Sequence, residues 1–202
     1  MILGKNIIQK NIELLDKTIF AKTKYQYFFK NLKKNKTYKI SKLSSFSIYV
    51  LDIIKKDKIF INDKRLNISV GDVLQLENLQ VSIKSVCRNL KILIVGTNKS
   101  KLSKKSLKIT KKKDIYKVNK PWGYELWLNG RHKNYSFKKI FLKKNFRTSL
   151  QFHKKKMETN VIFNGTAELS YKKNRYISNL KVTKKDISLK KLPSISKIFV
   201  KP

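Results

Sequence analysis

The amino-acid sequence predicts an all-β protein, and three observations support this fold class. Apolar residues gather in short segments rich in β-branched and aromatic side chains, turn residues separate these segments, and helical spacing of apolar residues is rare. Short strands that recur about every 8–12 residues with such turns are typical of a β-sandwich or a small β-barrel.

The first half of the chain contains most of these segments. Turn residues such as Asn62-Asp63 and Gly71-Asp72 separate them. One exception comes first: residues 6–19 place apolar side chains at 7, 8, 12, 14, 15 and 19, which predicts a short amphipathic helix. The predicted strands of this half are Tyr25–Phe29, Tyr38–Ile40, Phe46–Leu51, Lys58–Ile61, Val73–Leu76, Val81–Val86 and Leu90–Val95.

Residues 97–118 are rich in Lys, Ser and Thr and poor in apolar residues, which predicts a Lys-rich linker. The linker separates an N-terminal domain, residues 1–96, from a C-terminal domain, residues 119–202. A weak repeat of strands and turns, each copy with a turn ending in Asp, suggests that the two domains are copies of one unit. The predicted strands of the second half are Tyr124–Leu128, Tyr135–Leu142, Thr148–Phe152, Thr159–Phe163 and Ala167–Tyr171.

The composition indicates a soluble protein without a membrane partner. The chain is 41% hydrophobic, too apolar for a disordered polypeptide, yet no apolar run approaches the roughly 18 residues of a membrane helix. The N-terminal residues lack a secretory pattern, so we expect a cytoplasmic location. The single cysteine, Cys87, excludes an internal disulfide and a cysteine-based zinc site, and we expect it to be a small core residue.

The formal net charge of +37 raises the question of a nucleic-acid partner. Arginine occurs only at 65, 88, 131, 147 and 175, and the lysines are spread along the whole chain. A nucleic-acid binder more often concentrates arginine and aromatic residues on one face. Because Lys, Asn and Ile are all abundant, we attribute the charge to an AT-rich coding sequence and rank nucleic acid last among partners.

The most informative pattern begins at Asn145. It continues after five residues with Gln151, then His153, then after four residues Glu158, and after six more Gly165. Residues i and i+2 of a strand face the same side, so Gln151 and His153 project together, and a turn through 154–157 returns Glu158 to the same level. An amide oxygen, an imidazole and a carboxylate suit Zn²⁺ or another borderline divalent ion. The alternative is that these are surface hairpin residues.

This pattern resembles the first motif of the cupin superfamily, with Asn145 in place of its first glycine and Gln151 in place of its first histidine. The glutamine is similar to the phosphomannose isomerase variant of that motif. The segments Lys120-Pro-Trp-Gly-Tyr-Glu125, Ser149–His153 and Gly165–Glu168 extend the likeness. The chain therefore resembles the cupin domain of type II mannose-6-phosphate isomerases and related surface-polysaccharide cupins.

The resemblance implies two tandem cupin barrels of the jelly-roll, or double-stranded β-helix, type. The metal ligands would be Gln151, His153 and Glu158, and the ion a divalent metal such as zinc. The second cupin motif supplies a fourth ligand, a histidine, but residues 185–202 contain no histidine. We therefore expect a C-terminal barrel that is shortened at its end and a site that binds metal weakly.

The remaining candidates are less specific. In the N-terminal barrel Ser44, Ser45 and Ser47 occupy the places where ligands would lie, so we expect no metal site there. The other histidine, His132, follows Asn129-Gly-Arg and is expected to be a solvated turn residue. Trp122 and Trp127 are expected to pack over the barrel mouth, with stacking on a sugar as the alternative.

Two function hypotheses stay open on the sequence. The first is a metal-dependent sugar-phosphate isomerase-like cupin of the mannose-6-phosphate isomerase type, acting in carbohydrate, sugar-nucleotide or surface-polysaccharide metabolism. Arg147 and Lys156 would then bind the phosphate of a small sugar phosphate, while no catalytic residue is assigned. The second is a non-catalytic or degenerate bicupin that binds carbohydrate or a partner enzyme. The resemblance also implies a homodimer.

Overall fold

The computed structural model describes residues 8–11, 25–41, 43–53, 59–86, 89–98, 104–130, 132, 135–148, 157–161, 166–173, 176–183, 186–191 and 196–201. Over these residues the regular structure is β-strand, apart from one 3₁₀ turn, η2 (Lys112–Asp114). The predicted all-β class is therefore confirmed. Two tandem closed barrels remain a prediction.

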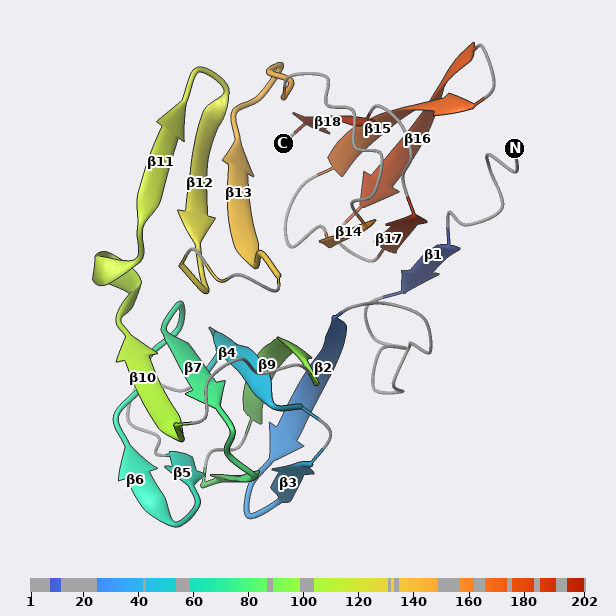
Figure 1. The fold of residues 1–202 in the computed structure, drawn as a ribbon. Coiled ribbons are helices and arrows are strands. Elements are labelled where there is room, and N and C mark those ends of the chain that lie inside the picture. The colour runs from blue at the N-terminus through green and yellow to red at the C-terminus, as the bar shows by residue number, and fades with distance from the viewer. Residues whose placement is uncertain are drawn as a thin grey trace. The chain divides into compact units, whose positions relative to one another are not determined.

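Two antiparallel sheets form most of the N-terminal half (Figure 1). The larger has the order β10-β7-β4-β9-β2, and the smaller has the order β3-β8-β5-β6. The larger contains β2 (Gln26–Lys33), β4 (Ser45–Asp52), β7 (Val73–Glu77), β9 (Asn89–Thr97) and β10 (Ser106–Thr110). The smaller contains β3 (Thr37–Ile40), β5 (Ile59–Ile61), β6 (Lys64–Leu66) and β8 (Val81–Ser85).

The core lies between these two sheets, because every second residue of their strands is apolar and faces the other sheet. In β4, Phe46, Ile48 and Val50 belong to one buried apolar cluster that also includes Ile59 of β5 and Ile83 of β8. Fully burying such a side chain contributes about 1.5–3 kcal/mol each. The residues between them in β4 are Ser45, Ser47 and Tyr49, which are also buried and face the opposite side. The larger sheet is thus covered on both faces at β4.

The predicted linker is wrong over part of its length. Ser106–Thr110 form β10, which pairs with β7 in the register Leu107↔Leu76 and Ile109↔Leu74. Leu107 and Ile109 pack against the apolar cluster. Lysine hides this alternation in the sequence, because Lys108 occupies the exposed side of the strand and further lysines flank it at both ends.

The helix predicted over residues 6–19 is wrong where the structure describes it. Ile8–Asn11 form strand β1, which pairs with β17 in the register Ile8↔Leu189. Pairing with a distant strand overrides the weak helical spacing, and isoleucine itself favours strands. The rest of that segment lies outside the described residues.

Three smaller sheets complete the described fold. Their orders are β11-β12-β13, β1-β17-β14 and β16-β15-β18. The strands are β11 (Lys117–Lys120), β12 (Gly123–Trp127), β13 (Lys138–Leu142), β14 (Met157–Val161), β15 (Thr166–Lys173), β16 (Tyr176–Thr183), β17 (Asp186–Lys191) and β18 (Ser196–Lys201). Among the described residues, no helix is long and apolar enough to cross a bilayer.

The chain divides into two compact units that do not follow chain order. One unit comprises residues 16–117 and 126–139, and the other comprises residues 1–15, 118–125 and 140–202. The segment 126–139, which we call the excursion, therefore belongs to the unit built mainly from the N-terminal half. It connects β12 to β13.

Candidate functional site

The predicted metal and substrate residues are only partly described by the structure. Arg147 is exposed just after β13, and Glu158 lies on β14, where its Cα pairs with that of Lys190 of β17. Gln151, His153 and Lys156 lie outside the described residues, as does Cys87. The convergence of the three predicted ligands therefore stays a prediction.

The turn that begins the predicted motif is described in full. Its amide Phe146 N donates to Lys143 O at 3.2 Å, and Lys143 N donates to Trp122 O at 2.9 Å. Asn145, at the position of the motif's first glycine, has φ of 63°. This left-handed conformation favours glycine and is tolerated by asparagine better than by other residues. The backbone therefore explains the residue type found at this motif position.

The segment Lys120–Glu125 is held against β13 by a close backbone approach. Gly123 has φ of +146°, and a Cβ atom built on it would clash with the carbonyl oxygen of Phe141. Only glycine allows this approach. The next residue, Tyr124, stacks on Phe141 with ring centroids 5.0 Å apart and an interplanar angle of 16°. The segment thus has a clear role in bringing β12 and β13 together.

The two tryptophans differ in their surroundings. The backbone of Trp122 accepts the hydrogen bond from Lys143 described above, whereas the ring of Trp127 has close side-chain neighbours. The Lys138 Nζ atom lies 3.8 Å from the Trp127 ring centroid, and the Tyr116 ring makes an edge contact at 6.2 Å. A cation so close to an indole face is favourable by about 0.5–1 kcal/mol at exposed sites.

His132 is not the solvated turn residue that the sequence predicts. Its Nε2 atom lies 3.0 Å from Ser45 Oγ and 3.2 Å from Glu77 Oε1, and Ser45 Oγ donates to Glu77 Oε1 at 2.7 Å. The His132 side chain is only 20% exposed and that of Glu77 12%. The excursion folds back onto the larger sheet, so the histidine finds partners that are distant in sequence.

A second contact of the excursion is fully buried. Tyr135 OH lies 3.1 Å from Ser47 Oγ, and Asn129 binds both ends of the loop through Nδ2 to Tyr135 O and through Oδ1 to Phe137 N, each at 2.9 Å. Burial raises the pKa of Tyr135 to about 12, and the negative charge of Glu77 adds to this, while the hydrogen bond with Ser47 opposes it. The tyrosine hydroxyl is therefore a neutral structural contact.

Ser45, His132 and Glu77 do not form a nucleophilic triad. Ser45 gives its proton to Glu77, so the contact at Nε2 requires the proton to be on that nitrogen of His132. A catalytic triad instead needs an unprotonated nitrogen facing the serine and a carboxylate on the opposite nitrogen. Nor do the described residues contain a group of three His, Cys, Asp or Glu that could hold a metal ion.

The sequence contains one signal for these contacts. In β4, Ser45, Ser47 and Tyr49 alternate with large apolar residues. Polar residues on one face of a strand normally indicate solvent. Here they indicate a second buried layer, since the excursion covers them with Tyr135 and His132.

The family model described as Mannose-6-phosphate isomerase C-terminal matches residues 88–188, half of the chain. The chain belongs to this family. The matched residues include the motif turn at Asn145 and all three predicted ligands, Gln151, His153 and Glu158. No curated protein matches the chain by sequence.

Solved structures similar to this chain are cupins and related proteins. The oxalate decarboxylase of Lactobacillus farciminis in its formate complex has a TM-score of 0.69 and 10% identity over 99% of this chain and 83% of that chain. The putative glyoxylate-induced protein from Pseudomonas aeruginosa has a TM-score of 0.71 and 7% identity over 98% and 85%. The cupin 2 conserved barrel domain protein from Leptotrichia buccalis has a TM-score of 0.52 and 14% identity over 99% and 86%.

At these low identities the likeness shows the fold alone. It confirms the cupin fold that the motif predicts. What the similar proteins bind or catalyse is not carried over to this chain by the likeness.

Proposed function

We propose that the chain is a metal-dependent sugar-phosphate isomerase-like cupin of the mannose-6-phosphate isomerase type, acting in carbohydrate metabolism. The substrate would be a small sugar phosphate. The observation that carries the proposal is the backbone at Asn145, whose φ of 63° suits the glycine position at which the cupin ligand motif begins. This conformation supports placing Asn145 at the first motif position, and the motif spacing then places the ligands at Gln151, His153 and Glu158.

The donor set fits a divalent metal by its chemistry. The amide oxygen of Gln151, the imidazole of His153 and the carboxylate of Glu158 are ligands that Zn²⁺ and similar ions accept. A metal held there would act as a Lewis acid that polarises the carbonyl or hydroxyl group of the sugar. Glu158 lies on β14, whose antiparallel pairing with β17 gives that backbone a fixed register.

Arg147 is the described residue best suited to the phosphate. It is exposed two residues after Asn145, and its guanidinium carries five N–H donors in a planar fork that fits phosphate oxygens. Lys156 would add a second positive charge. The high positive charge of the chain, +37, also favours the approach of an anionic substrate.

A second candidate is a non-catalytic or degenerate bicupin that binds carbohydrate or a partner enzyme. The observation in its favour is that residues 154–202 contain no histidine to act as a fourth ligand. Three protein ligands bind metal more weakly than four and leave the ion open to water.

The two candidates differ in metal content and turnover. We would measure the zinc content of the dialysed protein and its conversion of mannose 6-phosphate to fructose 6-phosphate. The chain has two histidines, which gives a matched pair of variants. We expect His153→Ala to lose both the metal and the activity, whereas His132→Ala keeps the metal because its contacts are with Ser45 and Glu77. A parent protein without metal or turnover would favour the second candidate.

A further inference from the structure

The segment after Glu125 is unusual in its charge. Between Glu125 and Glu158 the sequence contains no Asp or Glu. Its basic residues are Arg131, Lys133, Lys138, Lys139, Lys143, Lys144, Arg147, Lys154, Lys155 and Lys156. A long basic stretch without carboxylates leaves its positive potential unopposed along the chain.

Within this segment the structure exposes apolar side chains close together in sequence. Ile140, Phe141 and Phe146 are 45%, 49% and 44% exposed. Single exposed apolar residues are ordinary. Ile140 and Phe141 are neighbours in β13 and face opposite sides, so the feature of interest is the pair of exposed rings, Phe141 and Phe146, five residues apart. The rings are also held in place: Phe141 stacks on Tyr124, and the Nζ atom of Lys143 lies 5.6 Å from the ring centroid of Phe146.

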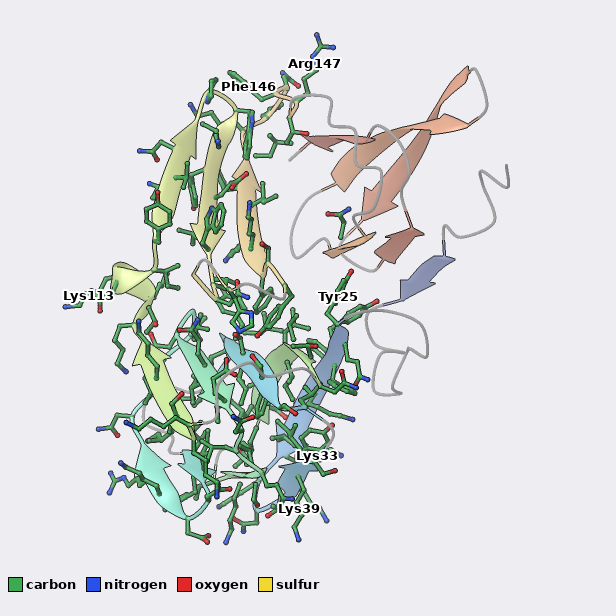
Figure 2. All side chains as sticks on the ribbon, in the orientation of Figure 1. Tyr25, Lys33, Lys39, Lys113, Phe146 and Arg147 are labelled. Atoms are coloured by element: carbon green, nitrogen blue, oxygen red, sulfur yellow. The ribbon has the colours of Figure 1, made fainter. Side chains whose placement is uncertain are left out.

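Exposed cations neighbour these aromatic residues in the sequence. Lys143, Lys144 and Arg147 are all exposed. Figure 2 shows Phe146 and Arg147 at the turn that follows β13, with the Arg147 side chain reaching away from the ribbon. We call Phe141, Lys143, Lys144, Phe146 and Arg147 the aromatic–lysine surface.

We propose that the aromatic–lysine surface binds single-stranded nucleic acid. Its cations would neutralise phosphates, and the open faces of Phe141 and Phe146 would stack on bases. This combination of positive charge and exposed rings is the one that sequence-tolerant single-strand binders use. A duplex is excluded as the preferred ligand because its bases are stacked on one another and present no free faces.

The sequence alone ranks nucleic acid last among partners because lysine is spread evenly along the chain, and that spread is a fact of composition. The exposure of aromatic rings inside the acid-free segment is a fact of structure, and charge alone does not require it. The proposal shares Arg147 with the sugar-phosphate function, but its tests use Phe141, Phe146, Lys143 and Lys144, to which that function assigns no role.

The first test separates stacking from charge. We would measure the affinity of the full chain, by fluorescence anisotropy at several salt concentrations, for a labelled thymidine oligomer of about 15 nucleotides. The matched ligand is an abasic oligomer of the same length, which has the phosphates but no bases, and heparin serves as a polyanion made of sugars. We expect the thymidine oligomer to bind about tenfold or more tightly than the abasic one. Equal affinities for all three would overturn the proposal.

The second test locates the site. The double variant Phe141→Ala/Phe146→Ala should bind the thymidine oligomer about tenfold or more weakly with an unchanged salt slope, because no charge is removed. Tyr116→Ala is the matched control, since Tyr116 is 51% exposed and lies outside the surface. Should Phe141→Ala disturb the fold, Phe141→Leu keeps an apolar side chain without a ring. Loss of affinity in the control to the same extent would sink the proposal.

The cations can be tested in the same way. Lys143→Ala/Lys144→Ala should weaken binding to both oligomers and lower the salt slope by about 1–2. The control pair is Lys104→Ala/Lys108→Ala, two exposed lysines of the other unit. If the two pairs weaken binding equally, the attraction is spread over the whole molecule and no site exists.

Discussion

Asn145 occupies a backbone conformation that few residue types accept. With φ of 63° it lies in the left-handed region, where a Cβ atom approaches the backbone carbonyl of the same chain segment. Asparagine reduces this penalty through local hydrogen bonding, and glycine has none. The identity of this residue thus links the motif spacing to the turn after β13.

We expect Asn145→Ala to lower the free energy of unfolding by about 1 kcal/mol and Asn145→Gly to leave it unchanged or raise it. Thermal and urea unfolding would measure both. Asn119→Ala, at an exposed position of β11, is the control and should change stability little. An Asn145→Ala protein as stable as Asn145→Gly would show that the turn does not require the left-handed conformation.

Because of Tyr135, we expect the free energy of unfolding to fall at alkaline pH. The folded protein raises its pKa from the ordinary value of 10.0 to about 12, so the folded state holds the proton more tightly than the unfolded chain. The resulting stabilisation is complete below pH 10 and is lost as the pH rises from about 10 to about 12, by about 2–3 kcal/mol.

The measurement is urea unfolding across that pH range for the parent and for Tyr135→Phe, which has no phenolic proton. Lysines and the other tyrosines titrate in both proteins, so the difference between the two curves isolates Tyr135. We expect the stability of the parent relative to the variant to fall through this window. Parallel curves would contradict the buried, neutral hydroxyl.

At the level of elements, β10 shows how one buried carboxylate fastens a segment that resembles a linker. The Asp72 carboxylate accepts hydrogen bonds from Ser69 N and Lys112 N at 2.9 Å and from Lys111 Nζ at 3.0 Å. Asp72 itself is 2% exposed. It therefore ties the turn before β7 to the chain that leaves β10.

Removing this carboxylate should release β10. We expect Asp72→Ala to lower the free energy of unfolding by about 2–4 kcal/mol, because the backbone N–H groups of Ser69 and Lys112 lose their acceptor and a partly buried ion pair is broken. Amide hydrogen exchange should accelerate first in β10. Asp52→Ala is the matched control: its pair with Lys91 is exposed, with side chains 53% and 41% accessible, and contributes little. Equal effects of the two variants would contradict this role.

The sequence predicts correctly the elements that have a clear local pattern, and it predicts wrongly those that depend on pairing with a distant strand. The segments around Phe46, Val73, Val81 and Leu90 alternate clearly and are strands. The sequence predicts a linker over residues 106–110 because the longer segment 97–118 is rich in lysine, and only two apolar residues of the strand stand out from it. It predicts a helix over Ile8–Asn11 because their partner, β17, lies far along the chain and no local pattern reveals it.

On the scale of the whole molecule, the sequence predicts the fold class and the family but not the path of the chain. The all-β class follows from short-range alternation, and the family follows from the motif and its neighbouring segments. The prediction for His132 is wrong because its partner Ser45 is 87 residues away in the sequence. For Gln151 and His153 the motif remains the basis of the prediction.

The excursion also has a consequence for folding during synthesis on the ribosome. Strand β9 ends at Thr97, but Ser45, Ser47 and Tyr49 of its sheet find their partners only in His132, Tyr135 and Lys139. At about 5–20 residues per second, roughly 40 further residues take about 2–8 s to be added. During this interval Ser45, Ser47 and Tyr49 lack these partners, so the nascent chain exposes an unfinished β-surface of the kind that chaperones bind.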